Sequence, residues 1–82
     1  MKTINKSVLK HLSQIKPEFN FLHSSNFVAE GLLDSFDVVH LVTVLDTEYN
    51  ISIDGIDIVP ENFSTIASIS KLLIKNGVLE CT

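Results

Sequence analysis

Tryptophan and arginine are absent from the 82 residues, which contain one tyrosine and one cysteine. Because five phenylalanines are the only other aromatic residues, the core must consist mainly of isoleucine, leucine and valine. The one cysteine, Cys81, cannot form an internal disulfide, and the sequence therefore requires no oxidising compartment. We expect a free thiol in a frayed tail, because catalysis would need a fixed pocket around it.

Positive charge is also scarce in this chain. Six lysines stand against ten acidic residues, which gives a formal net charge of −4. This balance argues against a nucleic-acid-binding protein and suits docking on basic patches of partner proteins. The chain starts without an apolar leader segment, and no apolar run is long enough for membrane insertion. We therefore expect a cytoplasmic protein, and nothing in the sequence demands more than a monomer.

Helical spacing of apolar residues dominates the pattern. The length and the 45% apolar content suit a single domain over residues 1–82. A first helix is predicted over about residues 3–16, and Pro17 ends it. Its predicted buried stripe comprises Ile4, Val8, Leu12 and Ile15.

A long connection, PEFNFLHSSNFVAEGLLD, follows this helix. Loops of this length inside small domains are usually functional or packed down by their own side chains. We expect its apolar residues to hold it against the core. These residues are Phe19, Phe21, Leu22, Phe27, Val28, Leu32 and Leu33.

The second predicted helix begins at Asp34 or Ser35 and runs to about Tyr49. Asp34 is a favourable N-cap, and Asp37, three residues later, resembles the acidic partner of a capping box. A stripe at helical spacing predicts the buried face of this helix. The stripe comprises Val38, Leu41, Val42, Leu45 and Tyr49.

The remaining residues predict one short and one long helix. The stretch ISIDGIDIVPEN is interpreted as an extended turn followed by a short helix near residues 55–59. The last helix is predicted to begin at a Ser64 cap and to stop at Gly77. Its predicted buried face comprises Ile66, Ile69, Leu72 and Leu73. The predicted fold is an all-α bundle of four helices, three long and one short, with a long first loop.

The other face of the second helix predicts a docking surface beside Ser35. Helical spacing places five residues together on this face: Phe36, Val39, His40, Thr43 and Thr47. A wholly solvated face would not normally carry phenylalanine and valine. Ser35 should project outward from the first turn, where free N–H groups favour a phosphate ester. No GxSxG motif surrounds Ser35 and no histidine base lies next to it, so we interpret it as an attachment point.

Around this serine, the stretch EGLLDSFDVVHLVTVLDTEYNISI and the later DIVPENFSTIASISKLL resemble the acyl carrier protein family, which includes peptidyl and D-alanyl carriers. The resemblance covers nearly the whole chain. It implies that Ser35 carries a covalent 4′-phosphopantetheine arm and that Asp34 helps a phosphopantetheinyl transferase to recognise the site. The arm would hold an acyl or aminoacyl group as a thioester, and the chain would be a carrier rather than an enzyme. An acyl- or aminoacyl-activating ligase would load it, and a downstream acyltransferase or synthase would unload it.

The resemblance also implies how partners dock. Phe36 and Val39 would form the apolar part of the contact. The acidic part would comprise Asp37, Asp46 and Glu48. Phe36, where leucine is commoner, is similar to the Asp-Ser-Phe motif of D-alanyl carriers, and His40 stands where many carriers have an acid. Both residues point to specialised partners, and His40 would make docking depend on pH.

Two other functions fit parts of the pattern. An unmodified helical interaction module would keep the same fold and docking face, whereas a small hydrolase using Ser35 would lack a local base. The stretch NISIDGIDIVPE matches several positions of a calcium-binding loop but departs from it at Asn50, Asp57 and Pro60. We expect His11 at the surface and His23 in the loop, and the spacing of the histidines predicts no metal site.

Overall fold

The computed structural model describes residues 3–78. These residues form three α-helices and three short 3-10 turns, with no strand among them. The elements are α1 (Thr3–Ile15), η1 (Phe21–His23), α2 (Ser35–Tyr49), η2 (Gly55–Asp57), η3 (Pro60–Phe63) and α3 (Ile66–Lys75). The all-α expectation is confirmed for this part of the chain, and Cys81 lies outside it. None of the described helices is both long and apolar enough to span a membrane.

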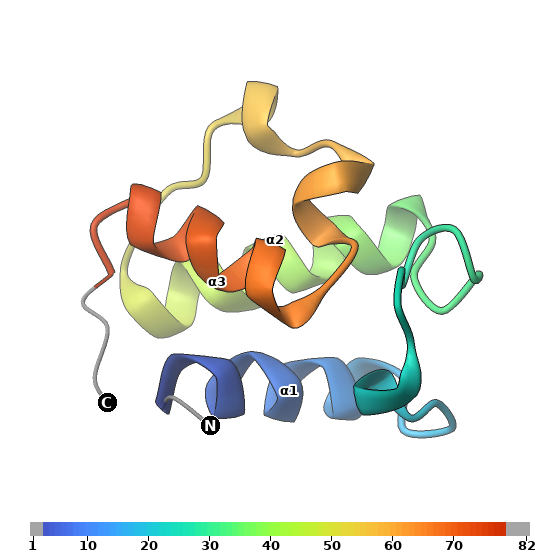
Figure 1. Ribbon diagram of the computed structural model, residues 1–82. Coiled ribbons are helices and arrows are strands. Elements are labelled where there is room, and N and C mark those ends of the chain that lie inside the picture. The colour runs from blue at the N-terminus through green and yellow to red at the C-terminus, as the bar shows by residue number, and fades with distance from the viewer. Residues whose placement is uncertain (1–2, 79–82) are drawn as a thin grey trace.

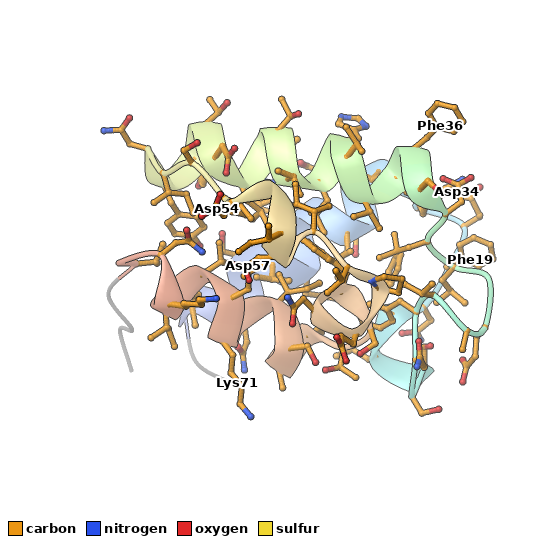
Figure 2. All side chains as sticks on the ribbon, turned by 90° about the horizontal axis from the view of Figure 1, so that it is seen from above. Phe19, Asp34, Phe36, Asp54, Asp57 and Lys71 are labelled. Atoms are coloured by element: carbon orange, nitrogen blue, oxygen red, sulfur yellow. The ribbon has the colours of Figure 1, made fainter. Side chains whose placement is uncertain are left out.

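The three α-helices enclose one apolar core. Figure 1 shows α1 along one side of α2 and α3, with the connection between α2 and α3 on the opposite side. Seen from above, α2 and α3 lie side by side and η2 lies over the space between them (Figure 2). The buried core comprises Ile4, Val8, Leu12, Phe21, Phe27, Leu33, Leu41, Val42, Leu45, Ile53, Phe63, Ile69, Leu72 and Leu73.

The helical spacing predicted the first two helices closely. Three of the four stripe residues of α1 are buried, and Ile15 is half-buried at the end of the helix. In α2 the residues Leu41, Val42 and Leu45 are buried, while Val38 and Tyr49 pack against the core from its edge. These stripes form because residues three or four apart lie on the same side of a helix.

The start of α3 corrects one prediction, because Thr65 and not Ser64 is its N-cap. Ser64 has helical backbone angles at the end of η3, and its hydroxyl donates to the carbonyl oxygen of Glu61. Thr65 is extended, and its Oγ1 accepts the N–H of Ser68 at 3.0 Å. An N-cap needs this non-helical backbone for its side chain to reach the first turn.

The end of α3 confirms the role predicted for Gly77. Its φ angle is +95°, a left-handed conformation that glycine adopts without a steric penalty from Cβ. The N–H of Gly77 donates to the carbonyl of Ile74, and the N–H of Val78 donates to that of Leu73, each at 3.0 Å. This pair of hydrogen bonds is a Schellman motif.

The long first loop is held to the core by only part of its apolar residues. Phe21, Phe27 and Leu33 are buried, and the rings of Phe21 and Phe27 meet edge to face at 5.0 Å between centroids. The expectation was wrong for Phe19 and Leu22, whose exposed fractions are 40% and 56%. Leu22 lies in η1, a 3-10 turn that the sequence pattern did not predict.

Two 3-10 turns, η2 and η3, occupy the segment where a short helix was expected near residues 55–59. Asp57 ties this segment to α3, because its carboxylate accepts two hydrogen bonds from Lys75 Nζ at 2.9 and 3.0 Å. The amide of Asn62 also donates to the carbonyl oxygen of Asp57 at 2.8 Å. These contacts fix the position of the segment that faces the start of α2.

His11 is buried, which corrects the expectation of a surface position. It lies on α1 with 8% of its area exposed, and both ring nitrogens are buried without a hydrogen-bond partner in residues 3–78. The nearest acid is Glu48 on α2, with 4.0 Å between Nε2 and Oε1. The helical spacing puts His11 three residues after Val8, beside the core stripe, and this position carries it inside.

His11→Leu is expected to raise the free energy of unfolding by about 1 kcal/mol. Burial of a polar group without a hydrogen bond costs about 1–3 kcal/mol, and a leucine of similar volume removes this cost. Urea unfolding of both proteins measures the difference, with Glu48→Gln as the control for the neighbouring acid. A clear loss of stability in His11→Leu would contradict the idea that the ring is unsatisfied.

Candidate functional site

Ser35 is the first residue of α2, and its side chain is exposed. The residue before it closes the predicted capping box: Asp34 Oδ1 accepts the N–H of Asp37 at 2.9 Å. Asp37 Oδ2 in turn accepts the N–H of Asp34 at 3.2 Å. None of the side-chain hydrogen bonds within residues 3–78 uses the hydroxyl of Ser35. The cap therefore fixes the backbone around a serine whose Oγ is free.

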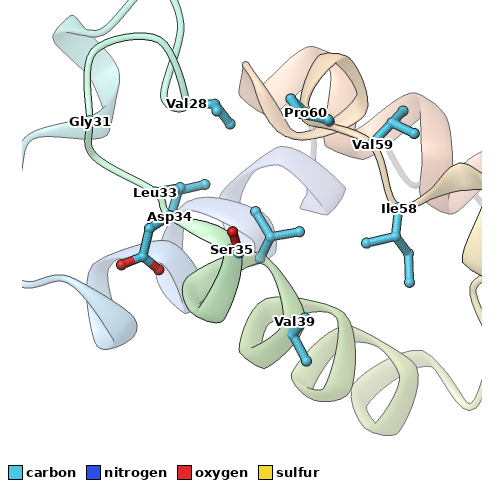
Figure 3. A pocket seen from close by; sticks show the side chains of 10 residues that line it. Val28, Gly31, Leu33, Asp34, Ser35, Val39, Ile58, Val59 and Pro60 are labelled. Atoms are coloured by element: carbon cyan, nitrogen blue, oxygen red, sulfur yellow. The ribbon is translucent and has the colours of Figure 1, made fainter.

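Ser35 lies at the edge of a groove of about 580 Å³. One wall comes from α2, a second from the loop before it, and a third from the segment between η2 and η3 (Figure 3). The lining residues are Val28, Gly31, Leu33, Asp34, Ser35, Val38, Val39, Ile58, Val59 and Pro60. Most of these side chains are apolar, and the two polar ones lie together at one end. In Figure 3 the carboxylate of Asp34 points away from the groove.

Backbone hydrogen bonds around Phe27 hold the loop wall in place. The N–H of Phe27 donates to the carbonyl oxygen of Ser64 at 2.7 Å, which joins the loop to the start of α3. The carbonyl oxygen of Phe27 accepts the N–H groups of Leu32 and Leu33 at 2.8 and 3.1 Å. Gly31, with a φ of +80°, makes the tight turn between these groups. The sequence did not predict this groove, because its walls come from distant segments.

A lysine directly after α1 balances the acids at this end of α2. Lys16 Nζ lies 3.5 Å from Asp37 Oδ2, and both side chains are largely buried. The hydrogen bond from the N–H of Asp37 lowers the pKa of the Asp34 carboxyl, and the nearby charge of Lys16 lowers it further. The sequence pattern did not indicate this contact, because Lys16 and Asp37 come from different segments of the chain.

Asp34→Asn is expected to reduce the loss of stability in acid. The folded-state pKa of Asp34 is lowered, so its contribution is complete above the ordinary value of 3.8 and is lost as the pH falls through the lowered value. Asparagine keeps an acceptor oxygen at the cap but does not titrate. Urea unfolding at about pH 5 and about pH 2.5 compares the two proteins. Equal losses in both proteins would show that the cap of α2 does not contribute to acid unfolding.

The five residues predicted to share one face of α2 are all exposed. We call this set, Phe36, Val39, His40, Thr43 and Thr47, the outer face of α2. The exposed fractions of Phe36 and Val39 are 86% and 58%. The hydroxyls of Thr43 and Thr47 donate to backbone carbonyls one turn earlier, at 3.1 and 3.0 Å. The face therefore presents mainly methyl groups, an aromatic ring and an imidazole.

The predicted acidic docking residues each make contacts inside the molecule. Asp37 belongs to the capping box and faces Lys16. Asp46 Oδ1 accepts the N–H of the buried Ile53 at 3.1 Å, which holds the chain after α2. Glu48 is exposed and lies 4.0 Å from His11. Their part in partner binding stays a prediction.

The chemistry that the described side chains offer at this site is attachment at an exposed hydroxyl beside an apolar groove. No group of three or more potential metal-ligating residues gathers anywhere in residues 3–78. No protein-family model matches the sequence, and the comparison with solved structures found no match to this chain. The site must therefore be interpreted from its own geometry and from the resemblance of its motifs.

Proposed function

We infer that the chain is a carrier protein with an acyl-carrier-like bundle, which holds an acyl or aminoacyl group as a thioester. The observation that supports this function best is Ser35 itself. It combines an exposed, unbonded hydroxyl, a capped first turn and an adjacent groove of about 580 Å³. A serine that served only to start the helix would need none of the groove.

The residues around Ser35 fit a 4′-phosphopantetheine group. The Oγ is the point of attachment, and the positive end of the α2 dipole favours the phosphodiester charge. Lys16 offsets the charge of Asp37, which would otherwise oppose it. When bound, the group supplies a thiol that carries the cargo as a thioester. The groove is lined mainly by apolar side chains, among them Val39 and Ile58. These side chains would shield an apolar part of that cargo from water.

Ser35 takes part in one covalent step, and a transferase catalyses it. Its Oγ attacks the phosphorus of coenzyme A that bears the pantetheine, and a new O–P bond forms. The P–O bond of the pyrophosphate breaks, and 3′,5′-ADP leaves. The hydroxyl proton passes to a base of the transferase, because no base of this chain contacts Oγ within the described residues. Asp34 acts by holding the first turn and by presenting a carboxylate beside the serine.

The partners that follow from this function are enzymes. A ligase activates the acyl or aminoacyl group and loads it, and an acyltransferase or synthase removes it. Phe36 and His40 on the outer face of α2 support a specialised biosynthetic or modification pathway, because both differ from the commoner residues of the family that the motifs resemble.

Intact mass spectrometry tests the proposal. We expect the full chain, incubated with coenzyme A and a broad-specificity phosphopantetheinyl transferase, to gain the mass of one phosphopantetheinyl group. Ser35→Ala should gain nothing. Ser13→Ala replaces a different exposed serine, which lies on α1. This variant should gain the same mass as the unchanged protein. No gain in the folded protein, with a known carrier modified in parallel, would contradict the proposal and favour an unmodified interaction module.

A further inference from the structure

We propose that the enzyme that modifies Ser35 binds the outer face of α2 in an uncharged, apolar pocket and not on a basic patch. This inference rests on the proposed carrier function and specifies its first partner. It arises from a difference between the overall charge of the chain and the charge of this face. The chain has a net charge of −4, yet none of the five residues of the outer face is acidic.

The acidic residues of α2 either make contacts inside the molecule or lie at the end of the helix opposite Ser35. The side chain of Asp37 is only 14% exposed, and its Oδ2 both accepts the N–H of Asp34 and faces Lys16. Asp46 is half-buried and accepts the N–H of Ile53. Their burial and these contacts make the two carboxylates less accessible to a basic patch of a partner. Glu48 stays exposed, but it lies in the last turn, at the end of α2 opposite Ser35.

Asp34 is exposed as well, but it lies before the first turn of α2 and outside the outer face. Its carboxylate accepts the N–H of Asp37. It offers one charge at the end of the contact, beside the reacting hydroxyl. A single charge at the rim of an interface affects the association rate more than the affinity.

What the outer face offers a partner is an aromatic anchor next to the reacting serine. Phe36 directly follows Ser35 and is 86% exposed, and Figure 2 shows its ring pointing away from α3 and η2. Val39, one turn later, joins this face to the groove, because it also lines the groove. In protein interfaces a few residues that enter well-packed pockets, often aromatic ones, carry most of the binding energy. A partner complementary to this face therefore needs an apolar pocket for Phe36, and a positive charge there would be desolvated without compensation.

Steady-state kinetics of the transferase with the full chain as substrate test this proposal. We expect Phe36→Ala to raise KM about tenfold with kcat unchanged, because the ring contributes to binding and not to the chemical step. Ile74→Ala, at an exposed apolar residue of α3, should change KM less than about twofold. Circular dichroism confirms that both variants fold. Between about 50 and about 500 mM NaCl, kcat/KM should change less than about threefold.

An acidic residue introduced on the outer face of α2 distinguishes a partner with an apolar pocket from a partner with a basic patch. His40→Glu should lower kcat/KM if the pocket is uncharged, because the new carboxylate is desolvated on binding. A rise in kcat/KM for His40→Glu, together with a steep fall in salt, would overturn the proposal in favour of a basic patch. Equal effects of Phe36→Ala and Ile74→Ala would show that the face is not contacted. A dimer that Phe36→Ala dissociates, detected by sedimentation, would assign the face to a second copy of the chain.

Failure of the docking proposal differs from failure of the carrier function. If Ser35 is modified with the salt dependence of a basic interface, only the docking proposal fails. If the folded, unchanged protein gains no group at all, the carrier function fails and the docking proposal falls with it.

Discussion

Phe27→Ala should lower the free energy of unfolding by about 3–5 kcal/mol and loosen the loop that walls the groove of Ser35. The ring of Phe27 is 1% exposed and meets the ring of Phe21 edge to face. Its removal leaves a cavity in the core, next to the ring of Phe21. A domain of 82 residues is stable by about 4–12 kcal/mol, so this loss takes a large share of the total.

Two measurements separate the local from the global effect of Phe27→Ala. Urea unfolding gives the loss of stability, and hydrogen exchange at the amides of Leu32 and Leu33, which donate to the carbonyl of Phe27, reports on the loop. Phe27→Leu should give an intermediate loss of stability. This variant replaces Phe27→Ala in both measurements if the alanine variant does not fold. Phe19→Ala is the matched control in the same loop, because Phe19 is 40% exposed. Similar losses at both positions would contradict the role given to Phe27.

Phe63→Ala is expected to cost about 3–5 kcal/mol as well, but for a different reason. Phe63 is fully buried at the end of η3, two residues before the cap of α3. Its ring fills the core where the connection between α2 and α3 returns to the helices. The variant should unfold at a much lower urea concentration, with a slope typical of a chain this size if the fold is kept.

The same substitution on the outer face of α2 is the control for Phe63. Phe36→Ala removes an identical ring that is 86% exposed, and it should change the free energy of unfolding by less than about 0.5 kcal/mol. A large loss in Phe36→Ala would mean that this ring supports the fold, which would weaken the docking proposal. A small loss of unfolding free energy in Phe63→Ala would mean that neighbouring core side chains near η3 move to fill the cavity left by the ring.

The candidate site was partly predictable from the sequence. The start of α2, the cap of Asp34 and the exposure of Ser35 and Phe36 all follow from patterns within about one turn of helix. The groove was not predictable, because Val28, Val39 and Ile58 come from three separate segments. The pairing of Lys16 with Asp37 was not predictable either, because the two residues come from separate segments. The modification of Ser35 stays a prediction, which the intact mass of the protein tests.

The sequence by itself determined the helices of this protein and the residues that begin and end most of them. Hydrogen bonds of a capping box and the spacing of apolar side chains act over three or four residues, so a linear pattern contains them. The tertiary structure alone decided that His11 is inside, that Asp46 holds the chain at Ile53, and that Thr65 caps α3 in place of Ser64. These outcomes depend on how the helices and their connections pack, and two neighbouring candidates for a cap are separated only by the backbone angles that this packing imposes.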